Sequence, residues 1–385
     1  MIPDQRHHGR SQILGAIRRA GRAARVDLAQ ETGISQATVT AITADLLREG
    51  LIKEVARKDE ISTRGRPRVD LSLRGAAHLV AGIKIAARGL SVIVMDFEGQ
   101  TIAEHLAPLP KECFAPEELL PLVAQALDCA LHGAGLERGA LSGFGIGLAG
   151  LIDTQTGIVR WSPSLTQRDT KFEALLSAHL GLPCFVDNDA NLVAMAEMYF
   201  GKAREIKDFL VVTIENGVGL GIVLNGALYR GTRGCGAEFG HTKVALNGAL
   251  CRCGQRGCLE AYVADYALLR EATAPDLATL IAHANAGDAA AKDVLARAGQ
   301  VFAMGLANLV NIFDPALIIL SGERMQHDHL YADDVIASIR DQIVQAGGPP
   351  PEVQIHKWGD LMWAKGAAAY AISRVSDTAL AQISR

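Results

Sequence analysis

One histidine and three cysteines lie close together in the middle of the chain: His241, Cys251, Cys253 and Cys258. Three thiolates and one imidazole complete the tetrahedral shell that Zn²⁺ prefers, and they leave no position for a reactive water. The run CRCGQRGC also contains Gly254 and Gly257, and glycine reaches the positive φ angles that a tight loop needs. The alternative is a chance group of buried thiols. The spacing favours a structural zinc site held by these four residues.

The N-terminal 75 residues have a charge balance of their own. They contain 14 Lys or Arg and nine Asp or Glu, whereas the whole chain has a net charge of −4. A basic module joined to an acidic body is typical of proteins that bind phosphate groups, including those of DNA. Charge alone is weak evidence, so the class of the module depends on its helix signals.

Three helix signals follow one another within the module. Ser11 is predicted to cap a first helix, and Asp27 to cap a second one. Gly33 supplies a turn, and Ser35 opens a third helix with the sequence SQATVTAITADLLREG. This spacing predicts a helix-turn-helix.

The third helix has an apolar face and a face of small or polar residues. The apolar side chains are expected to point into the module: Val39, Ile42, Leu46 and Leu47. The opposite face is expected to carry Thr43 and the candidate DNA contacts Ser35, Gln36, Ala37, Thr38 and Thr40. Such a surface fits a major groove, because glutamine pairs with adenine and threonine contacts phosphates or the thymine methyl group.

Alternating apolar and polar residues follow Gly50 on both sides of a charged loop, which predicts a two-stranded wing. Within the loop, an extended RGRP segment would lay the guanidinium groups of Arg64 and Arg66 along the minor groove of A·T-rich DNA. The alternative is a basic, flexible linker. Together these signals predict a winged helix-turn-helix at residues 1–75.

The remaining residues predict an α/β body with two similar halves. From residue 79, two alternating apolar runs joined by a glycine turn are followed by a third strand, and the pattern recurs near residue 208. Segments of helical period lie between them, at residues 116–132 and 190–200. A repeat of this kind suggests internal duplication into two lobes flanking a small-molecule site.

Three motifs in this body, GAEFGH, CRCGQRGCLE and FVDNDAN, resemble those of the ROK family, a name that stands for repressors, open reading frames and sugar kinases. The resemblance implies a two-lobed, actin-like sugar-kinase fold with a zinc knuckle. The winged helix and RGRP segment resemble those of the xylose- and N-acetylglucosamine-responsive repressor branch. The implied domains are 1–75, lobe 1 at 76–200 with helix 361–385 returning to it, and lobe 2 at 201–360.

The segments that bind nucleotide phosphates in kinases of this family depart from the family pattern. The DxGGT segment corresponds to residues 84–88, where Lys84 replaces a carboxylate suited to Mg²⁺ and alanines replace two glycines. The GTG segment reads Glu215-Asn216-Gly217, and a later glycine-rich segment reads Ser321-Gly322-Glu323. These changes predict that the protein has no kinase activity and no catalytic residue.

The sugar-binding positions of the family match better. The resemblance assigns sugar binding to Gly150, Ser164, Asn188, Asp189, Glu238, His241 and Glu260. Asp189 stands at the position of the kinase base, and its other interpretation is a helix N-cap. His241 would bind zinc through one ring nitrogen and a sugar hydroxyl through the other. Ala149 and Ser164 differ from the family pattern, so the sugar stays open.

The resulting hypothesis is a sugar-responsive repressor that binds operator DNA as a homodimer or a dimer of dimers. Two alternatives are an ATP-dependent sugar kinase with a DNA-binding domain and a repressor controlled by a protein partner, such as a sugar-transport component. The cysteine pattern, the polar N-terminus and the lack of a long apolar run favour a cytoplasmic protein that contacts no membrane.

Overall fold

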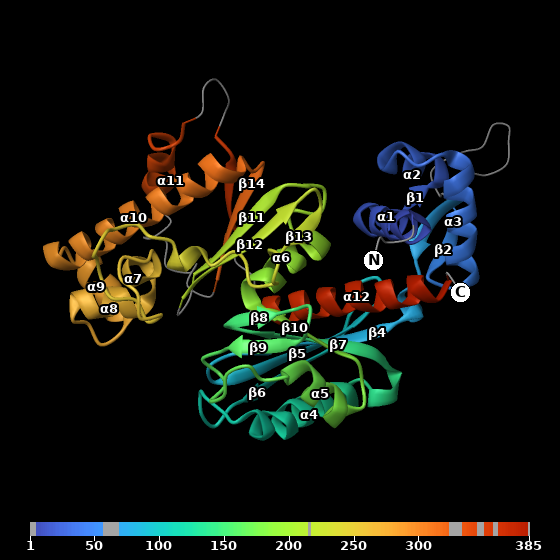
Figure 1. Ribbon diagram of the computed structural model, residues 1–385, viewed down its shortest axis with the longest axis horizontal. Coiled ribbons are helices and arrows are strands. Elements are labelled where there is room, and N and C mark those ends of the chain that lie inside the picture. Colours follow the sequence, from blue (N-terminus) through green and yellow to red (C-terminus); the bar gives the residue numbers. More distant parts are fainter. Residues whose placement is uncertain are drawn as a thin grey trace. The chain divides into compact units, whose positions relative to one another are not determined.

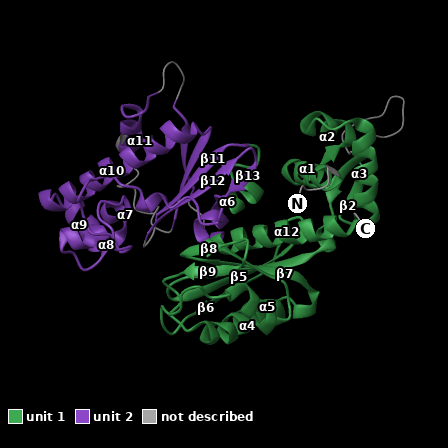
Figure 2. Ribbon diagram, viewed as in Figure 1, with its two compact units in different colours: residues 1–188, 195–205, 363–385 green, residues 189–194, 206–362 purple. Residues whose placement is uncertain are grey.

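The computed structural model describes residues 5–56, 69–214, 217–322, 333–344, 350–356 and 361–383. The chain forms two compact units, shown in Figure 2. Unit 1 contains Met1–Asn188, Met195–Glu205 and Trp363–Arg385, and unit 2 contains Asp189–Ala194 and Ile206–Met362. Both units mix helices and strands, which confirms the predicted α/β class. The domain limits inferred from the resemblance remain predictions.

The first part of unit 1 is a winged helix-turn-helix, called the module below (Figure 1). Its elements are α1 (Gln5–Ala20), β1 (Ala23–Ala24), α2 (Arg25–Thr32), α3 (Gln36–Arg48), β2 (Ile52–Ala56) and β3 (Val69–Leu73). The wing strands β2 and β3 pair antiparallel, and β1 adds to the other side of β3. Gly33 ends α2 in the left-handed conformation at φ 71°, and Ser35 caps α3 by accepting the Thr38 amide.

Three local predictions in the module were wrong. Ser11 lies inside α1, which already includes Gln5, so it caps nothing. Asp27 is the third residue of α2 and not its N-cap, which is Ala24. The Asp27 carboxylate accepts a hydrogen bond from the Ala24 amide. Thr43 is fully buried rather than exposed, and its hydroxyl accepts a hydrogen bond from Arg25 Nε of α2 at 3.1 Å.

The rest of unit 1 is built on a five-stranded sheet with the order β10-β7-β4-β5-β6. Its elements are β4 (Leu79–Ile85), β5 (Gly89–Asp96), β6 (Thr101–Pro108), α4 (Pro116–Gly133), β7 (Leu141–Leu148), β8 (Leu151–Asp153), β9 (Ile158–Trp161), α5 (Phe172–Leu180), β10 (Cys184–Asn188) and α12 (Met362–Ile383). Helix α6 (Asp189–Phe200) is shared between the units, because its first residues, Asp189–Ala194, belong to unit 2 and the rest to unit 1. Short 3-10 helices cover Gly75–Ala77 and Arg138–Ala140. Helices α4 and α5 cover one face of the sheet, and α12 covers the other (Figure 1).

Helix α12 packs directly on the backbone of the sheet at two glycines. A Cβ atom at Gly82 of β4 would collide with the backbone of Ala364 and Ala368, and one at Gly145 of β7 would collide with that of Ala367. The alternation of β4 turns Ala81 and Ile83 to the opposite face, where they pack with α4. Small residues on both surfaces therefore bring helix and sheet into close contact.

Unit 2 contains a second five-stranded sheet, with the order β13-β12-β11-β14-β15. Its elements are β11 (Phe209–Ile214), β12 (Val218–Leu224), β13 (Ala227–Tyr229), α7 (Glu260–Val263), α8 (Asp265–Ala272), α9 (Leu277–Asn285), α10 (Ala289–Phe313), β14 (Leu317–Ser321), α11 (Asp333–Arg340) and β15 (Glu352–His356), with a 3-10 helix at Phe239–His241. The long helix α10 supplies much of the apolar core against β11, β12 and β14.

The two sheets have the same topology. In each, three consecutive strands form an antiparallel meander, and two later strands add in parallel beside the first of the three. The strands β4, β5, β6, β7 and β10 thus correspond in order and direction to β11, β12, β13, β14 and β15. This agreement supports the internal duplication predicted from the sequence. Within the described part of the chain, no helix is both long and apolar enough to cross a membrane.

Candidate functional site

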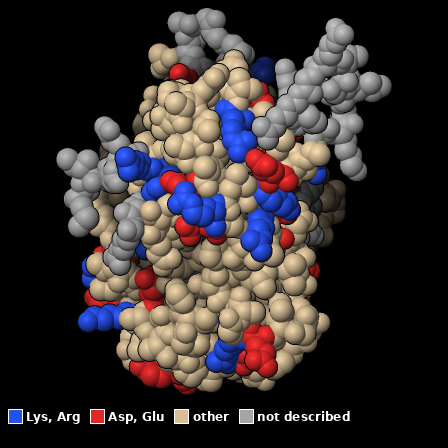
Figure 3. Space-filling model, turned by 90° about the vertical axis from the view of Figure 1, so that its right-hand side faces the viewer, with Lys and Arg blue, Asp and Glu red and all other residues tan. Residues whose placement is uncertain are grey.

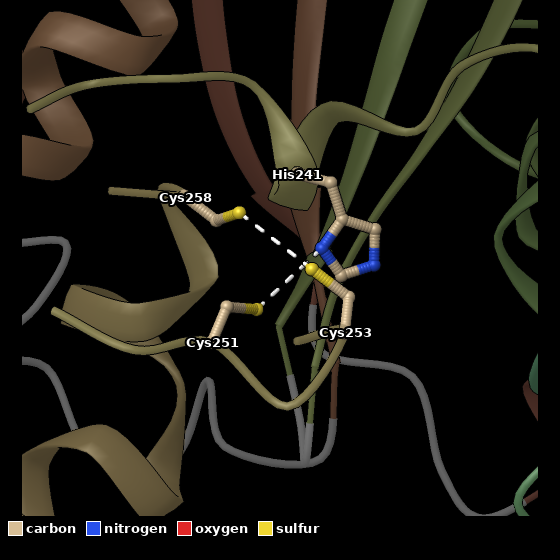
Figure 4. Close-up of side chains that lie close together, drawn as sticks. All are labelled: His241, Cys251, Cys253 and Cys258. Carbon is tan, nitrogen blue, oxygen red and sulfur yellow. Dashed lines mark hydrogen bonds between the residues drawn. The ribbon is translucent and has the colours of Figure 1, made fainter. Parts of the chain in front are cut away.

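The four predicted metal ligands converge in unit 2 (Figure 4). His241 ends the 3-10 helix, and the three cysteines lie in the loop that precedes α7. The four ligand atoms lie within 4.8 Å of one another. Cys253 Sγ and Cys258 Sγ are 3.8 Å apart, and Cys251 Sγ is 3.7 Å from His241 Nδ1. The described residues therefore form a cluster that could hold a metal ion.

These spacings can be compared with a tetrahedral site. Metal–sulfur bonds of about 2.3 Å and metal–nitrogen bonds of about 2.0–2.1 Å imply sulfur–sulfur edges of about 3.8 Å and sulfur–nitrogen edges of about 3.6 Å. The observed 3.8 Å and 3.7 Å agree with both. Because Nδ1 of His241 faces the sulfurs, Nε2 is the nitrogen that points away from the cluster (Figure 4).

Polar side chains around the cluster supply charge and orientation. Lys243 Nζ donates to Cys258 Sγ at 3.0 Å, which places a basic side chain beside this sulfur. The Tyr266 hydroxyl contacts Cys251 Sγ at 3.5 Å and Glu260 Oε1 at 3.3 Å. Burial raises the pKa of Tyr266, so this hydroxyl stays a donor. Burial also raises the pKa of the Cys251 thiol, opposed by its hydrogen bond from the Cys253 amide.

Four of the seven predicted sugar residues belong to unit 2: Asp189, Glu238, His241 and Glu260. Desolvation raises the pKa of Glu238; His241 lowers it, while the carboxylates of Glu260 and Asp189 raise it further. Glu238, His241, Glu260 and Asp189 therefore lie close enough for their charges to interact. Glu260 is buried, and its Oε2 accepts the Val218 amide at 3.4 Å. Such a group offers several acceptors to a polyhydroxylated ligand.

The other three sugar residues belong to unit 1: Gly150, Ser164 and Asn188. Asn188 Nδ2 donates to the Gly150 carbonyl at 2.7 Å. Gly150 has φ 132°, and a Cβ atom there would collide with the Trp161 carbonyl, so the position requires glycine. Ser164 is buried, and its amide contacts Ser162 Oγ at 3.2 Å. Asp189 begins α6, and its Oδ1 accepts the Ala190 amide.

The phosphate segments are described only in part. Lys84 is buried near the end of β4, with its ammonium 5.6 Å from the Trp363 ring. Arg88 is exposed and pairs with Glu112 at 2.9 Å. Glu215, Asn216 and Glu323 lie outside the described residues. A buried ammonium packed on an indole ring replaces the carboxylate that the resemblance leads one to expect.

The predicted DNA contacts of the third helix are all exposed: Ser35, Gln36, Ala37, Thr38 and Thr40. The hydroxyls of Thr38 and Thr40 contact Ser35 Oγ and the Gln36 carbonyl, both at 2.8 Å. Arg64 and Arg66 lie outside the described residues. Figure 3 shows Lys and Arg side chains interspersed with Asp and Glu side chains on one face of the molecule. Within the module, Arg10 forms an ion pair with Asp45, and Arg25 forms one with Glu54.

Comparison with known proteins connects this fold and site to one family. The family model described as "ROK family" matches residues 80–374, which is most of the chain. The chain belongs to the ROK family. A second model, described as "Winged helix-turn-helix DNA-binding", matches residues 10–53 of this ROK protein. The resemblance drawn from the three motifs is thereby confirmed.

Curated relatives of this ROK protein include two repressor types. It is 28% identical over 342 residues to the DNA-binding transcriptional dual regulator NagC of Escherichia coli, covering 85% of this chain and 83% of the relative. It is also 28% identical over 357 residues to the xylose repressor of Bacillus spizizenii, covering 92% of each chain. Both relatives align over more than four fifths of this chain.

Solved structures of ROK proteins share the fold. A ROK transcriptional regulator described as a homolog of the E. coli MLC protein aligns over 98% of both chains with a TM-score of 0.79, at 23% identity. The ROK hexokinase of Thermus thermophilus is 30% identical, with a TM-score of 0.67, and covers 76% of this chain and 97% of its own. The hexokinase thus aligns with about three quarters of this chain, whereas the regulator aligns along nearly all of it.

Sequence reasoning missed Lys243 and Tyr266 as neighbours of the cysteine cluster in this ROK protein. Lys243 follows His241 by two residues, so proximity in the chain could have suggested it. Tyr266 is the second residue of α8, and only the packing of α7 and α8 brings its hydroxyl to Cys251. No motif in the sequence marks that contact.

Proposed function

We propose that this protein is a sugar-responsive transcriptional repressor. The module would bind operator DNA, and the ROK domain would bind a sugar that changes the operator affinity. The observation that carries the proposal is an exposed recognition helix on the same chain as a ROK body with clustered carboxylates. The names of the curated relatives support it, because they include an N-acetylglucosamine repressor and a xylose repressor.

Gln36 is the residue of α3 best suited to read a base. The Thr38 and Thr40 hydroxyls already make local hydrogen bonds, and Ser35 caps the helix. Gln36 is exposed in the first turn of α3, the part of a recognition helix that contacts base edges. Its amide offers a donor and an acceptor, which match adenine N7 and N6.

The DNA-binding part is tested with Gln36→Ala. A lost bidentate base contact costs about 1–3 kcal/mol, which is a loss of roughly 5- to 150-fold in affinity. The measurement is fluorescence anisotropy on a duplex selected by the wild-type protein from random DNA. Gln125→Ala, which removes an exposed glutamine from α4, is the matched control and should bind as the wild type does. Equal affinities of the two variants would remove Gln36 from the interface.

For the effector we propose a sugar that binds Asp189, Glu238, Glu260 and the Nε2 atom of His241 in unit 2. Gly150, Ser164 and Asn188 of unit 1 stay sugar-binding candidates. N-acetylglucosamine and xylose are the first probes, because curated relatives carry those names. A sugar that prefers one conformation by about 2–3 kcal/mol would change the operator affinity by roughly 30- to 150-fold. We further propose a homodimer on a pseudo-palindromic operator.

For the cysteine cluster we propose zinc in a structural role. The ligand set of three sulfurs and one imidazole suits Zn²⁺, and the edge lengths agree with tetrahedral coordination. With Nδ1 of His241 toward the cluster, the ring is oriented so that Nε2 is available to a sugar hydroxyl. The bound ion would thereby fix the orientation of one sugar-binding side chain.

A second candidate function is an ATP-dependent sugar kinase, which the likeness to the hexokinase favours. Asp189 would then accept the proton of the attacking hydroxyl. We propose instead that phosphoryl transfer does not occur, because the buried Lys84 replaces a carboxylate suited to Mg²⁺. ADP release from Mg-ATP in the presence of N-acetylglucosamine, glucose or xylose would contradict this part of the proposal.

A further inference from the structure

The module is joined to the rest of unit 1 by a continuous apolar core. One cluster of buried residues includes Ile13 and Ile17 of α1, Val80 and Ile93 of the sheet, and Leu380 of α12. The module is therefore packed on the sheet of unit 1 and on α12, which the view of Figure 1 also shows. Any change in this packing would change the position of α3 relative to the sheet.

At the edge of this core, Arg18 of α1 reaches across to the turn between β5 and β6. Its Nη1 donates to the Phe97 carbonyl at 2.7 Å, and its guanidinium lies 4.9 Å from the Phe97 ring and 5.3 Å from the Tyr199 ring. Among the described residues, Nη2 of Arg18 is buried without a hydrogen-bond partner. Asp96 adds a favourable charge interaction with Arg18, but a buried cation whose hydrogen bond goes to a carbonyl is less well compensated than one bonded directly to a carboxylate.

A second arginine, from the segment after α6, donates hydrogen bonds to the end of α1. Arg204, which follows α6, donates through Nη2 to the Arg18 carbonyl at 3.0 Å and to the Arg19 carbonyl at 2.9 Å. These carbonyls belong to the last turn of α1, where the helix itself offers no partner. Arginines near a helix C-terminus satisfy such groups and interact favourably with the helix dipole. The end of α1 is thus held from two sides.

The segment that carries Arg204 is fixed to the end of α6. Glu197 Oε2 accepts the Lys202 amide at 3.0 Å, and the Gly201 amide bonds back to the Ala196 and Glu197 carbonyls. The Phe200 ring lies against Gly99, where any Cβ atom would collide with it. Gly99 belongs to the turn that also contains Phe97, the partner of Arg18. The end of α6, this turn and the end of α1 therefore form one packed junction.

We propose that Arg204 is a positioning residue that transmits a sugar-dependent movement of α6 to α1. The idea rests on the proposed function, because α6 begins at Asp189, one of the sugar-binding candidates. A shift of α6 along or about its axis would displace Arg204 from the two carbonyls of α1. Because Nη2 of Arg18 has no hydrogen-bond partner among the described residues, hydration of this guanidinium competes with the docked arrangement, although Asp96 interacts favourably with its charge. The module then changes position, and the operator affinity changes with it.

The test replaces Arg204 by Met, which keeps much of the length and removes the donors. The readout is the ratio of operator affinities without and with sugar. The sugar is N-acetylglucosamine or xylose, whichever changes the operator affinity of the wild-type protein. We expect this ratio to fall from roughly 30- to 150-fold to below about fivefold, while the sugar still raises the melting temperature. Arg204→Lys, which keeps one cationic donor, should restore part of the ratio. Arg19→Met, which removes a neighbouring side chain that pairs with Glu31, should keep all of it.

If Arg204→Met binds sugar and keeps the wild-type ratio of operator affinities, the inference is overturned. If Arg204→Met does not fold, a wild-type ratio of operator affinities in Arg204→Lys overturns it instead. A wild-type protein that binds no operator or answers neither sugar contradicts the proposed function instead. The junction is then tested without any sugar, by hydrogen–deuterium exchange. Arg204→Met should exchange the amides of the last turn of α1 at least tenfold faster than Arg19→Met does. Equal rates would overturn the inference.

Discussion

At the scale of single residues, the three sulfurs of the cysteine cluster are held in place in different ways. Cys253 is exposed, whereas Cys251 and Cys258 are buried, so the third sulfur is held at the cluster by its short loop rather than by core packing. Gly254 and Gly257 adopt φ angles of 87° and 75° in that loop. The sequence predicted this convergence correctly because all four ligands lie within one short stretch of chain. The identity of the metal remains a prediction.

Cys253→Ser is expected to lose the bound zinc. A serine hydroxyl is a poor zinc ligand, and ligand loss removes binding energy that is coupled to folding. The measurement is metal content of the purified protein by atomic emission, together with its melting temperature. Cys113→Ser, at an exposed cysteine outside the cluster, is the control and should retain the metal. Full zinc retention and unchanged melting of Cys253→Ser would show that this sulfur is not a ligand.

Glu173 of α5 predicts a pH dependence of stability. Burial raises the pKa of this carboxyl above its ordinary value of 4.5, against the opposing effects of its hydrogen bond from the Val186 amide and of Arg374. The folded state therefore holds the proton more tightly than the unfolded state does. The stabilisation of the folded state that comes from protonated Glu173 is fully present below pH 4.5. It is lost as the pH rises through the raised pKa.

Glu173→Gln is expected to remove this loss while keeping a carbonyl oxygen for the Val186 amide. The urea midpoint measured at pH 5 and pH 7.5 should fall less in Glu173→Gln than in the wild type. Glu137→Gln changes an exposed glutamate of the same unit and serves as the control. An identical fall in the wild type and Glu173→Gln would mean that Glu173 does not contribute to the pH dependence.

At the scale of elements, the close approach of α12 to the sheet depends on Gly82 and Gly145. A methyl group at Gly82 would meet backbone atoms, which cannot rotate away as a flexible side chain can. Overpacking of this kind costs about 1–3 kcal/mol. Gly82→Ala should therefore lower the free energy of unfolding by about that amount, measured by urea denaturation. Gly139→Ala, where nothing lies within 4 Å of the new methyl, should change it little; equal effects would refute the close contact.

The element boundaries show what local sequence signals can predict. Ser35 could be identified as the N-cap of α3 because a cap depends only on residues close to it in the sequence. The structure confirms the prediction, since the Ser35 side chain accepts a hydrogen bond from the Thr38 amide. Ser11 was misread, since the polar start of α1 resembles a tail and not a helix. Thr43 was assigned to the exposed face from periodicity, but its partner Arg25 comes from another helix. Helical periodicity describes a face and says nothing of the side chain that will cover it.

At the scale of the whole molecule, motifs predicted the family, and the comparisons confirmed it. The repeated strand pattern likewise predicted the duplication that the two matching sheets show. The contacts of Arg204 with Arg18 and Arg19 were not predictable, because these residues lie more than 180 positions apart and neither belongs to a motif. Such contacts depend on the packing of complete elements.

We propose that this one chain couples sugar binding to operator binding. The most direct measurement is the operator affinity of the purified wild-type protein, by fluorescence anisotropy, in the absence and presence of N-acetylglucosamine and of xylose. We predict a change of roughly 30- to 150-fold with one of these sugars and no change with Mg-ATP alone. An operator affinity that stays the same with both sugars, although a sugar binds and raises the melting temperature, would contradict it.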